Sequence, residues 1–401
     1  MRIGVLLSRF PYPLEKGDKL RAFHQIRCLS ENHEIFLCAI SAKKVDQKAI
    51  DELQPYCKAI KIIHLSKASI LINVLYGLVF SRLPLQVAYF FNRKAKKRIH
   101  RFFEASQIDH LYCQLIRVAE YVKDYEHAPK TLDYMDALSR GMVRRTESTP
   151  FYLKPFVKIE ATRLKRYEHF IFSDFEHLTI ISEQDRKFII HAQNSKISII
   201  RNGVDQHYFK PVENVVKEYE LLFTGNMSYP PNVDCAEFLA NEVMPLVWKK
   251  LPQAKLAIAG ATPSARVKSL QADRIMITGW VDDMRKMYGS SKVFVAPMRI
   301  GSGLQNKLLE AMAMKLACIT SPLANNALKA IDGKDILIAD DATSVSQQAV
   351  RLLNDESYAN TLATQGFQFI SSNYDWKSST TQLEALFLAS NQNHGRIKAA
   401  D

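Results

Sequence analysis

The stretch Arg299-Ile-Gly-Ser-Gly-Leu-Gln-Asn-Lys-Leu-Leu-Glu-Ala-Met-Ala-Met314 decides the fold. It follows an apolar run, Lys292–Met298, that is typical of a buried strand, and it begins a helix. The apolar positions of that helix are Leu304, Leu308, Leu309, Met312 and Ala313. A loop of small residues between a parallel strand and a helix binds anions in α/β proteins, because free amide groups and the helix dipole point at the ligand.

The helix also places Lys307 and Glu310 one turn apart on the same face. A cation and a carboxylate in this position can hold a diphosphate and a ribose, which predicts a nucleotide-sugar site. A single basic residue on a helix is more often part of a solvated face, but here small, amide and charged residues share one junction. The predicted donor-binding residues of the stretch are Arg299, Gly301, Ser302, Gly303, Leu304, Gln305, Asn306, Lys307 and Glu310.

Length and composition indicate a globular protein of two domains. The chain has 401 residues, 47% of them hydrophobic and 24% charged, which is enough for two separate cores. Its net charge of +13 predicts attraction to an anionic partner, such as a phosphorylated substrate, anionic lipid or nucleic acid. No nucleic-acid-binding module is recognisable, so nucleic acid is not an expected partner.

The six cysteines and the N-terminus indicate a cytoplasmic protein. The cysteines form no C-x-x-C pair, which favours free thiols in a reducing compartment and argues against a zinc site. The N-terminus enters a strand directly and has too short an apolar core for a secretory signal. The longest apolar stretch, Ala68 to Phe91, is interrupted by Arg82 and Pro84 and does not predict a spanning helix.

Strands and helices alternate along both halves, which predicts an α/β fold with doubly wound, mostly parallel sheets. We expect an N-terminal domain over 1–205, a donor-binding domain over 206–375, and a helix from 376 to 401 that crosses back to the first domain. Segments 71–103 and 151–172 are predicted to be helical insertions in the first domain.

Two motifs of the first half are predicted to end strands at the ligand edge of the sheet. Gly17 and Arg21 lie where the first helix begins, although an ordinary strand–helix loop is the alternative reading. No G-x-G-x-x-G follows the first strand, which disfavours nicotinamide binding. Asp133 and Asp136 follow a later strand. Asp136 is interpreted as a base or an orienting group for a sugar hydroxyl, with a helix cap as the competing role.

Two motifs of the second half are predicted to lie at the corresponding edge. Gly225 and Asn226 follow the first strand of that half, where a plain loop is the alternative. Gly279 and Trp280 follow another strand, and their backbone is placed to flank a nucleotide base. Asp282 or Asp283 is expected to cap the next helix.

A basic and aromatic region, 71–101, favours contact with an anionic membrane surface. Tyr76, Phe80 and Tyr89–Phe91 lie among its apolar residues, and Arg93–Arg101 is strongly basic. Arg82, Arg163, Lys165 and Arg166 extend this region in the prediction. A solvated helix face is the alternative.

The second half resembles the donor domain of a GT-B glycosyltransferase of the retaining, family 4-like class. The resemblance rests on four stretches: Ile200–Asp205, Gly279-Trp-Val-Asp-Asp283, Val295–Gly303 and Asn306–Met314. In the first half, Gly17-Asp-x-x-Arg21 and Asp133-x-x-Asp136-Ala-x-Ser139 resemble exopolysaccharide sugar transferases found beside PEP-CTERM sorting systems.

The resemblance implies roles for individual residues. Glu310 corresponds to the second of two glutamates spaced eight positions apart, and it is expected to bind the donor ribose. Ser302 occupies the position of the first glutamate. The Arg and Lys usual after the first donor-domain strand are replaced by the stretch Asn226–Asn232, so Lys307 and Arg299 are expected to supply the positive charge.

The resulting hypothesis is a glycosyltransferase that uses a UDP- or GDP-sugar as co-substrate, with no other cofactor and no metal. Retention of configuration is implied by the family. Lys307, Glu310 and Asp136 are the expected catalytic residues, and the acceptor is a saccharide or lipid-linked saccharide on the first domain. Gly17 and Arg21 are expected to approach the phosphates when the domains close. A GT-B nucleotide-sugar epimerase and a non-catalytic binding protein with a decayed donor site are the alternatives.

Overall fold

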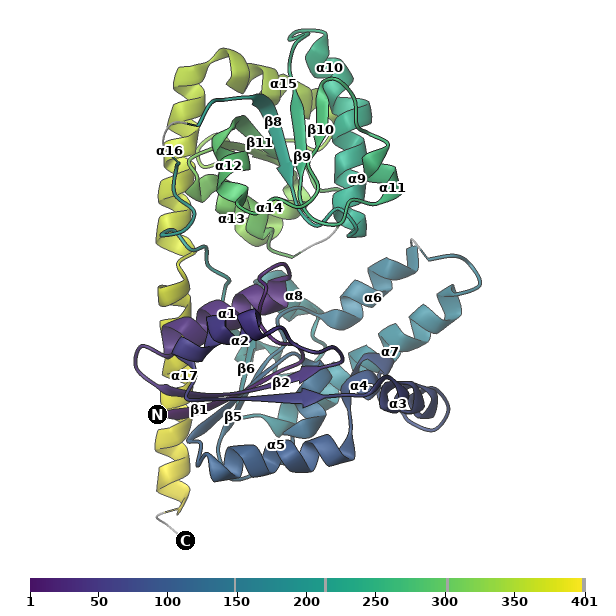
Figure 1. Cartoon of the computed structure of the whole chain (residues 1–401), viewed down its shortest axis with the longest axis vertical. Coiled ribbons are helices and arrows are strands. Elements are labelled where there is room, and N and C mark those ends of the chain that lie inside the picture. Colours follow the sequence, from purple (N-terminus) through teal and green to yellow (C-terminus); the bar gives the residue numbers. More distant parts are fainter. Residues whose placement is uncertain (148, 213–214, 301–302, 399–401) are drawn as a thin grey trace. The chain divides into compact units, whose positions relative to one another are not determined.

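The computed structural model describes residues 1–147, 149–212, 215–300 and 303–398, and it consists of two compact α/β units (Figure 1). The first unit comprises Met1–Arg201 and the C-terminal segment from Lys377, and the second comprises Asn202–Trp376. Each unit contains one parallel sheet covered by helices on both faces. This confirms the predicted fold class.

The first sheet has seven parallel strands in the order β3-β2-β1-β4-β5-β6-β7. Its strands are β1 (Arg2–Leu7), β2 (Glu34–Ser41), β3 (Ala59–His64), β4 (His110–Gln114), β5 (Lys130–Asp133), β6 (His177–Ile180) and β7 (Ser198–Ile199). The strand order reverses direction between β1 and β4, and ligands bind at such a switch point in open parallel sheets.

The two faces of this sheet carry separate cores. Side chains of β1 alternate, so that Val5 packs on one side and Leu6 on the other. One side is covered by α1 (Gly17–Leu29), α2 (Gln47–Leu53) and α17 (Trp376–Lys398). The other is covered by α4 (Leu85–Phe90), α5 (Arg93–Ala105) and α7 (Lys154–Phe170). The remaining helices of the unit are α3 (Lys67–Val79), α6 (Leu138–Glu147) and α8 (Glu183–Phe188).

The second sheet has six parallel strands in the order β10-β9-β8-β11-β12-β13. They are β8 (Tyr219–Thr224), β9 (Leu256–Ala259), β10 (Ile275–Ile277), β11 (Ser291–Ala296), β12 (Ala317–Thr320) and β13 (Leu337–Ile338). The helices are α9 (Pro230–Phe238), α10 (Met244–Trp248), α11 (Ala265–Lys268), α12 (Met284–Gly289), α13 (Asn306–Ala313), α14 (Pro322–Leu328), α15 (Ala342–Asn354) and α16 (Glu356–Asn373). The switch point of this sheet lies between β8 and β11.

The boundary between the units lies at 201/202, whereas the sequence placed it at 205/206. The physical reason is a short pairing within the second unit. The amide of Val204 donates to the carbonyl of Tyr374 at 2.8 Å, and Gly203 packs so closely on Trp376 that a Cβ would lie 2.4 Å from its nitrogen. These contacts fix residues 202–205 to the second unit.

Helix α17 packs on the first sheet through Leu383 and Phe387, both of which are fully buried. The ring of Phe387 stacks on that of His110 with centroids 4.3 Å apart. Glu384 is 2.7 Å from Nε2 of His33. The chain therefore returns to its first unit at its C-terminal end.

The helical insertions differ in detail from their prediction. Segment 71–103 contains most of α3, all of α4 and most of α5, and α6 precedes α7. In the second unit a π-helical segment, Leu239–Val243, lies between α9 and α10. Among the described residues, no helix is long and apolar enough to cross a membrane.

Candidate functional site

Three glycines line the carboxyl edge of the second sheet, one after each of three neighbouring strands. Gly225 follows β8, Gly260 follows β9 and Gly279 follows β10. The amide of Gly260 donates to the carbonyl of Gly279 at 3.1 Å. A Cβ on Gly260 would lie 1.9 Å from the carbonyl oxygen of Gly225, and all three have φ between +68° and +156°. Neighbouring atoms leave no room for a side chain at Gly225 and Gly260, whereas Gly279 has open space beside it; the positive φ of all three favours glycine.

Lys307 reaches this edge from the first turn of α13. Its ammonium donates to Oδ1 of Asn232 at 2.5 Å and lies 4.5 Å from the centroid of the Phe223 ring. Burial lowers the pKa of Lys307 to about 8, against the opposing effects of Cys235 and Glu310. Within the described residues, no carboxylate lies at ion-pair distance from this ammonium. The charge is therefore desolvated and available to an anion.

Glu310 lies one turn further along α13. The hydroxyl of the fully buried Tyr288 donates to its Oε2 at 2.8 Å and is 3.1 Å from Oγ1 of Thr224. Burial raises the pKa of Glu310 to about 7, although the Tyr288 hydrogen bond and Lys307 oppose the rise. A carboxylate oriented in this way can accept hydrogen bonds from vicinal hydroxyls.

The start of α13 adds backbone donors. Gln305 is its N-cap residue and makes no side-chain capping hydrogen bond, since its Nε2 donates to the carbonyl of Gly303 at 2.9 Å. Uncapped first-turn amides favour an anion. Asn306 accepts from Asn202 at 3.4 Å, and Leu304 packs against the core. Gly301 and Ser302 lie outside the described residues.

Asn226 and Trp280 flank the same edge. The side-chain oxygen of Asn226 accepts from Ser228 Oγ at 2.7 Å and Thr262 Oγ1 at 2.8 Å, so it orders its own loop. Trp280 leaves 62% of its surface exposed, and its Nε1 donates to Asp282 at 2.9 Å. A fixed, exposed indole beside Gly279 offers a face for stacking. Asp283, and not Asp282, caps α12.

Arg299 does not join this group. Its guanidinium binds Asp234 at 2.9 Å and Glu242 at 3.2 Å, and it lies 4.4 Å from the centroid of the Phe238 ring. Two carboxylates already neutralise this cation. The structure therefore shows Arg299 held by these carboxylates, while Lys307 is the predicted cation that reaches the edge.

The prediction that Arg21 approaches the phosphates is wrong, because Arg21 lies inside the first unit. It has no exposed surface, and its Nε donates to Oδ2 of Asp133 at 2.6 Å. The hydroxyl of Tyr112 donates to the same oxygen at 2.7 Å. A buried guanidinium held in this way cannot approach a phosphate. Gly17 begins α1, and a Cβ built there would have no neighbour within 4 Å.

Asp136 lies beyond the carboxyl end of β5 and is exposed. Desolvation by the surrounding protein, with the like charge of Asp185, raises its pKa to about 6, while Arg117 and Arg144 oppose the rise. Arg117 follows β4 and donates to Oε1 of Gln86 at 2.8 Å. The structure thus adds Arg117, Arg144 and Asp185 to the predicted Asp136, and no local motif marks them.

The backbone around Asp136 is strained. Leu115, after β4, has φ of +70°, and Met135, after β5, has φ of +62°. Side chains rarely adopt this region, and residues held in it cluster at ligand-binding edges. The carboxyl edge of the first sheet is therefore a second candidate surface, separate from the edge that holds Lys307.

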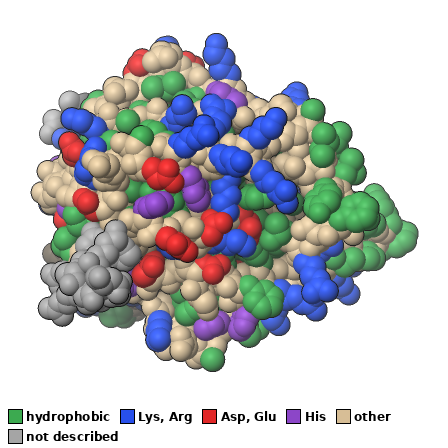
Figure 2. Space-filling model, turned by 90° about the horizontal axis from the view of Figure 1, so that it is seen from below, with side chains coloured by type: hydrophobic (Ala, Val, Ile, Leu, Met, Phe, Trp, Pro, Cys, Tyr) green, Lys and Arg blue, Asp and Glu red, His purple; other side chains and the backbone are tan. Residues whose placement is uncertain are grey.

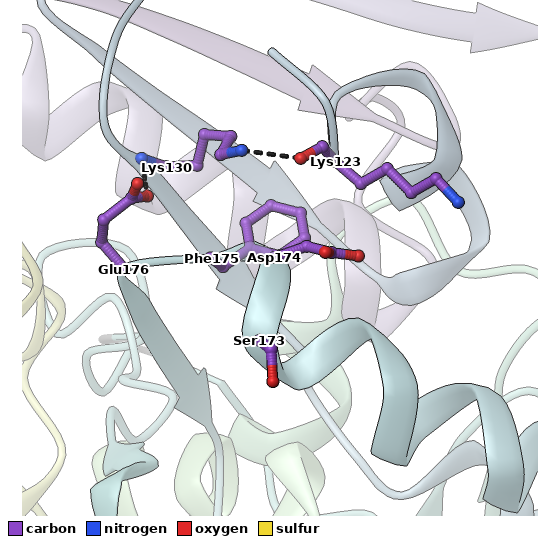
Figure 3. Close-up of a pocket in the computed structure, with 6 residues that line it drawn as sticks. All are labelled: Lys123, Lys130, Ser173, Asp174, Phe175 and Glu176. Atoms are coloured by element: carbon purple, nitrogen blue, oxygen red, sulfur yellow. Dashed lines mark hydrogen bonds between the residues drawn. The ribbon is translucent and has the colours of Figure 1, made fainter. Parts of the chain in front are cut away.

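One hollow opens at the opposite edge of the first sheet (Figure 3). It is lined by Lys123, Lys130, Ser173, Asp174, Phe175 and Glu176. Lys130 donates through Nζ to the carbonyl of Lys123 at 2.7 Å, and through its amide to Glu176 at 2.6 Å. The ammonium of Lys130 and the carboxylate of Glu176 are thus engaged in hydrogen bonds within the chain. The hollow lies at the amino ends of β5 and β6, away from both candidate edges. In the described part of the chain, no group of three or more His, Cys, Asp or Glu is placed to hold a metal.

Comparison with known sequences finds a family match and a relative. Residues 218–355 match the family described as glycosyl transferases group 1. An uncharacterized 44.6 kDa protein in the cps region of Klebsiella pneumoniae is 23% identical over 398 residues, covering 94% of this chain and 97% of that protein.

Solved structures share the fold of the whole chain. Sucrose-phosphate synthase from Thermosynechococcus elongatus has a TM-score of 0.69 at 14% identity, with 100% of each chain covered. Anabaena Alr3699/HepE in complex with UDP-glucose has a TM-score of 0.67 at 12% identity, covering 97% of this chain and 100% of that one. Most of the second unit thus matches the glycosyl transferases group 1 family, and the chain as a whole has the fold of these structures, the GT-B fold.

Proposed function

We propose that this enzyme transfers a sugar from a nucleoside diphosphate sugar to a saccharide or lipid-linked acceptor, without a metal and with retention of configuration. The observation that carries the proposal is Lys307, a desolvated cation without a carboxylate partner within the described residues, one turn from Glu310 at a switch point. A UDP-sugar is the favoured donor, because the similar structure of Anabaena HepE was solved with UDP-glucose. The relative in a cps region supports a role in cell-surface polysaccharide synthesis.

In the proposed reaction, negative charge develops on the diphosphate as the anomeric bond breaks. Lys307 stabilises that charge, and the first-turn amides of α13 add hydrogen bonds to it. The approaching diphosphate raises the pKa of Lys307 again from about 8, which keeps the ammonium protonated during transfer. A fixed cation and a helix N-terminus can stabilise the charge of the leaving diphosphate, which a divalent metal does in other enzymes.

Glu310 orients the donor by accepting hydrogen bonds from the ribose hydroxyls, while Tyr288 holds the carboxylate in place. Trp280 stacks on the base in this proposal. The acceptor binds the carboxyl edge of the first sheet, where Asp136 orients or deprotonates the attacking hydroxyl.

A ligand screen tests the donor. Thermal unfolding is measured with UDP, GDP, ADP and their sugars, and calorimetry follows for any nucleotide that raises Tm. We expect UDP or UDP-sugars to raise Tm, with no requirement for added Mg²⁺ and no loss in EDTA. No shift with any of these nucleotides would overturn the donor site. Consumption of the donor without an acceptor would instead indicate an epimerase.

A further inference from the structure

Helix α3 is an apolar helix that the rest of the protein barely covers. It has 13 residues, and Gly77 is its one buried residue. Gly77 packs against α4 so closely that a Cβ would lie 2.8 Å from that of Ala88. Ile70 packs against the core of the first unit. Seven large apolar side chains of this segment are exposed, with Phe80 just beyond the helix at 75%; they are Leu71, Ile72, Leu75, Tyr76, Leu78, Val79 and Phe80.

A second exposed apolar group lies where α7 begins. Phe151 leaves 83% of its surface exposed, which is unusual for a residue of its size. The group consists of Phe151, Tyr152, Leu153, Phe156 and Ile159. It was not part of the membrane region predicted from the sequence.

Polar contacts hold these two groups together in the first unit. Arg163 of α7 donates to the carbonyls of Gly77 at 2.8 Å and Leu78 at 3.2 Å, at the end of α3. Glu160 of α7 accepts from the amides of Leu85 and Gln86 at the start of α4. The two exposed groups are therefore carried by elements that hydrogen bonds join, and we name them together the apolar face: the exposed residues of α3, Phe80 and the start of α7.

The charge around the apolar face is positive. Between Glu52 and Glu104 the chain has ten Lys and Arg residues and no Asp or Glu. Lys67 and Arg82 flank α3, Lys158 lies on α7, and all three are exposed. On the side of α3 and α7, at the right of Figure 2, hydrophobic side chains gather and Lys and Arg side chains border them.

We propose that the apolar face inserts into the surface of an anionic lipid bilayer. The exposed Leu, Ile, Phe and Tyr side chains of the apolar face drive insertion, and the nearby cations bind the headgroups. Helix α3 spans only about 20 Å at 1.5 Å per residue, so it lies in the plane of the interface and does not cross the core. A protein partner would be expected to present carboxylates to these cations and also to contact the apolar side chains. A bilayer meets both needs without a specific sequence.

The proposal changes the membrane region predicted from the sequence. Helix α5 keeps its basic residues, but Phe90 and Phe91, which precede it, pack against the core of the first unit. Aromatic side chains that insert come instead from α3 and from the start of α7. The proposed binding does not depend on sugar transfer, since the apolar face and Lys307 lie in different units.

Flotation with vesicles tests this proposal. The full chain is mixed with vesicles of phosphatidylcholine alone and with vesicles that also contain phosphatidylglycerol. We expect flotation mainly with the second kind, reduced by high salt. The triple variant Tyr76→Ser, Phe80→Ser, Phe156→Ser should lower the bound fraction by about tenfold or more, because three exposed anchors are lost. The matched control, Val216→Ser with Ile331→Ser, removes exposed apolar side chains of the second unit and should float like wild type.

Three outcomes would overturn the proposal. The first is failure of the wild type to float with either kind of vesicle, and the second is equal flotation of the triple variant and the wild type. A concentration-dependent dimer that the triple variant abolishes, without vesicle binding, would assign the apolar face to a second copy of the chain. Calorimetry with UDP on the triple variant separates this result from the donor site: unchanged UDP binding shows that the second unit is intact.

Discussion

Lys307 and Arg21 are both basic residues on helices that follow strands at ligand edges, yet they have opposite environments. Arg21 is fully buried and bound to Asp133 at 2.6 Å. Lys307 binds a neutral amide, and within the described residues it has no carboxylate partner. The difference teaches that proximity to a ligand edge does not identify a ligand-binding cation. What identifies it is the side chain of the same protein that the cation binds: a carboxylate for Arg21 and a neutral amide for Lys307.

The two residues also contribute differently to stability. A buried ion pair with matched hydrogen bonds is costly to break, because removal of one member leaves an uncompensated charge. A desolvated cation without a counter-charge is itself unfavourable to the fold and is retained for what it binds. Arg21 should therefore matter for folding, and Lys307 for activity.

Substitution of Arg21 should produce the largest effect on folding. Arg21→Ala leaves Asp133 charged and buried beside Tyr112, and we expect it to lower the free energy of unfolding by about 3–5 kcal/mol. Urea unfolding followed by circular dichroism measures this loss. The double variant Arg21→Met, Asp133→Leu should lose less than the sum of the two single changes. A melting curve of Arg21→Ala equal to that of wild type would remove the distinction between the two cations.

Substitution of Lys307 should produce the largest effect on turnover. Lys307→Met keeps the apolar stem but removes the charge, and kcat should fall by about 10²–10³-fold, as for loss of one transition-state donor. Its Tm at pH 7 should be unchanged or higher, because a desolvated charge is gone. Lys249→Ala, an exposed lysine of the same unit, is the matched control. Near-normal sugar transfer by Lys307→Met would refute the phosphate role.

Glu310→Gln should weaken donor binding by about tenfold, since the amide keeps one acceptor oxygen. The same substitution should stabilise the fold at high pH, although it weakens donor binding. Burial raises the pKa of Glu310 from 4.5 to about 7, so the folded state binds more protons than the unfolded state between these values. The contribution of Glu310 to stability is therefore lost as pH rises from 4.5 to 7.

We accordingly expect Glu310→Gln to melt about 2 °C above wild type at pH 8 and no higher than wild type at pH 4.5. Calorimetry with UDP and thermal scans at both pH values provide the measurements. Unchanged UDP affinity would exclude Glu310 from the site, whereas a lower Tm at pH 8 would show that its carboxylate stabilises the fold.

Asp136→Asn tests the edge of the first sheet. The pKa of Asp136 is raised to about 6, so wild-type transfer should decline as pH falls through 6 if the ionised carboxylate acts on the acceptor. The asparagine variant should be slower by about tenfold or more at pH 7 and should lose this acidic limb. Persistence of the same limb in the variant would assign the titration to another group.

The fold, and the strand–helix junction that holds Lys307 and Glu310, were predictable because their signals are local. Apolar runs followed by turn residues marked the strands, and the strand, loop and helix around Lys307 and Glu310 lie within one continuous stretch. The partners that define their chemistry were not predictable. Asn232 lies 75 residues from Lys307, and Tyr288 lies 22 residues from Glu310.

The same reason explains why the burial of Arg21 and the ion pairs of Arg299 were not predicted. Arg21 meets Asp133 across 112 residues of sequence, and Arg299 meets Asp234 across 65. Each arginine lies in a motif that suits a phosphate-binding role. The carboxylate that pairs with it is distant in the sequence, and only the fold brings the two together. The exposed aromatic residues near Phe151 were missed for a related reason. Apolar residues at the start of a helix are expected to be buried, and only the structure shows that these are exposed.

Arg299 gives the smallest predicted effect and the sharpest control for the comparison. It is nearer to Lys307 in sequence than any other cation of the strand–helix junction, but its charge is shared between Asp234 and Glu242 on a partly exposed surface. Ion pairs of this kind contribute about 0–1 kcal/mol. Arg299→Met should therefore change Tm only slightly and leave UDP affinity within about twofold of wild type. A loss of affinity as large as that of Lys307→Met would mean that Arg299 leaves its carboxylates when the donor binds, and the two cations would then act together.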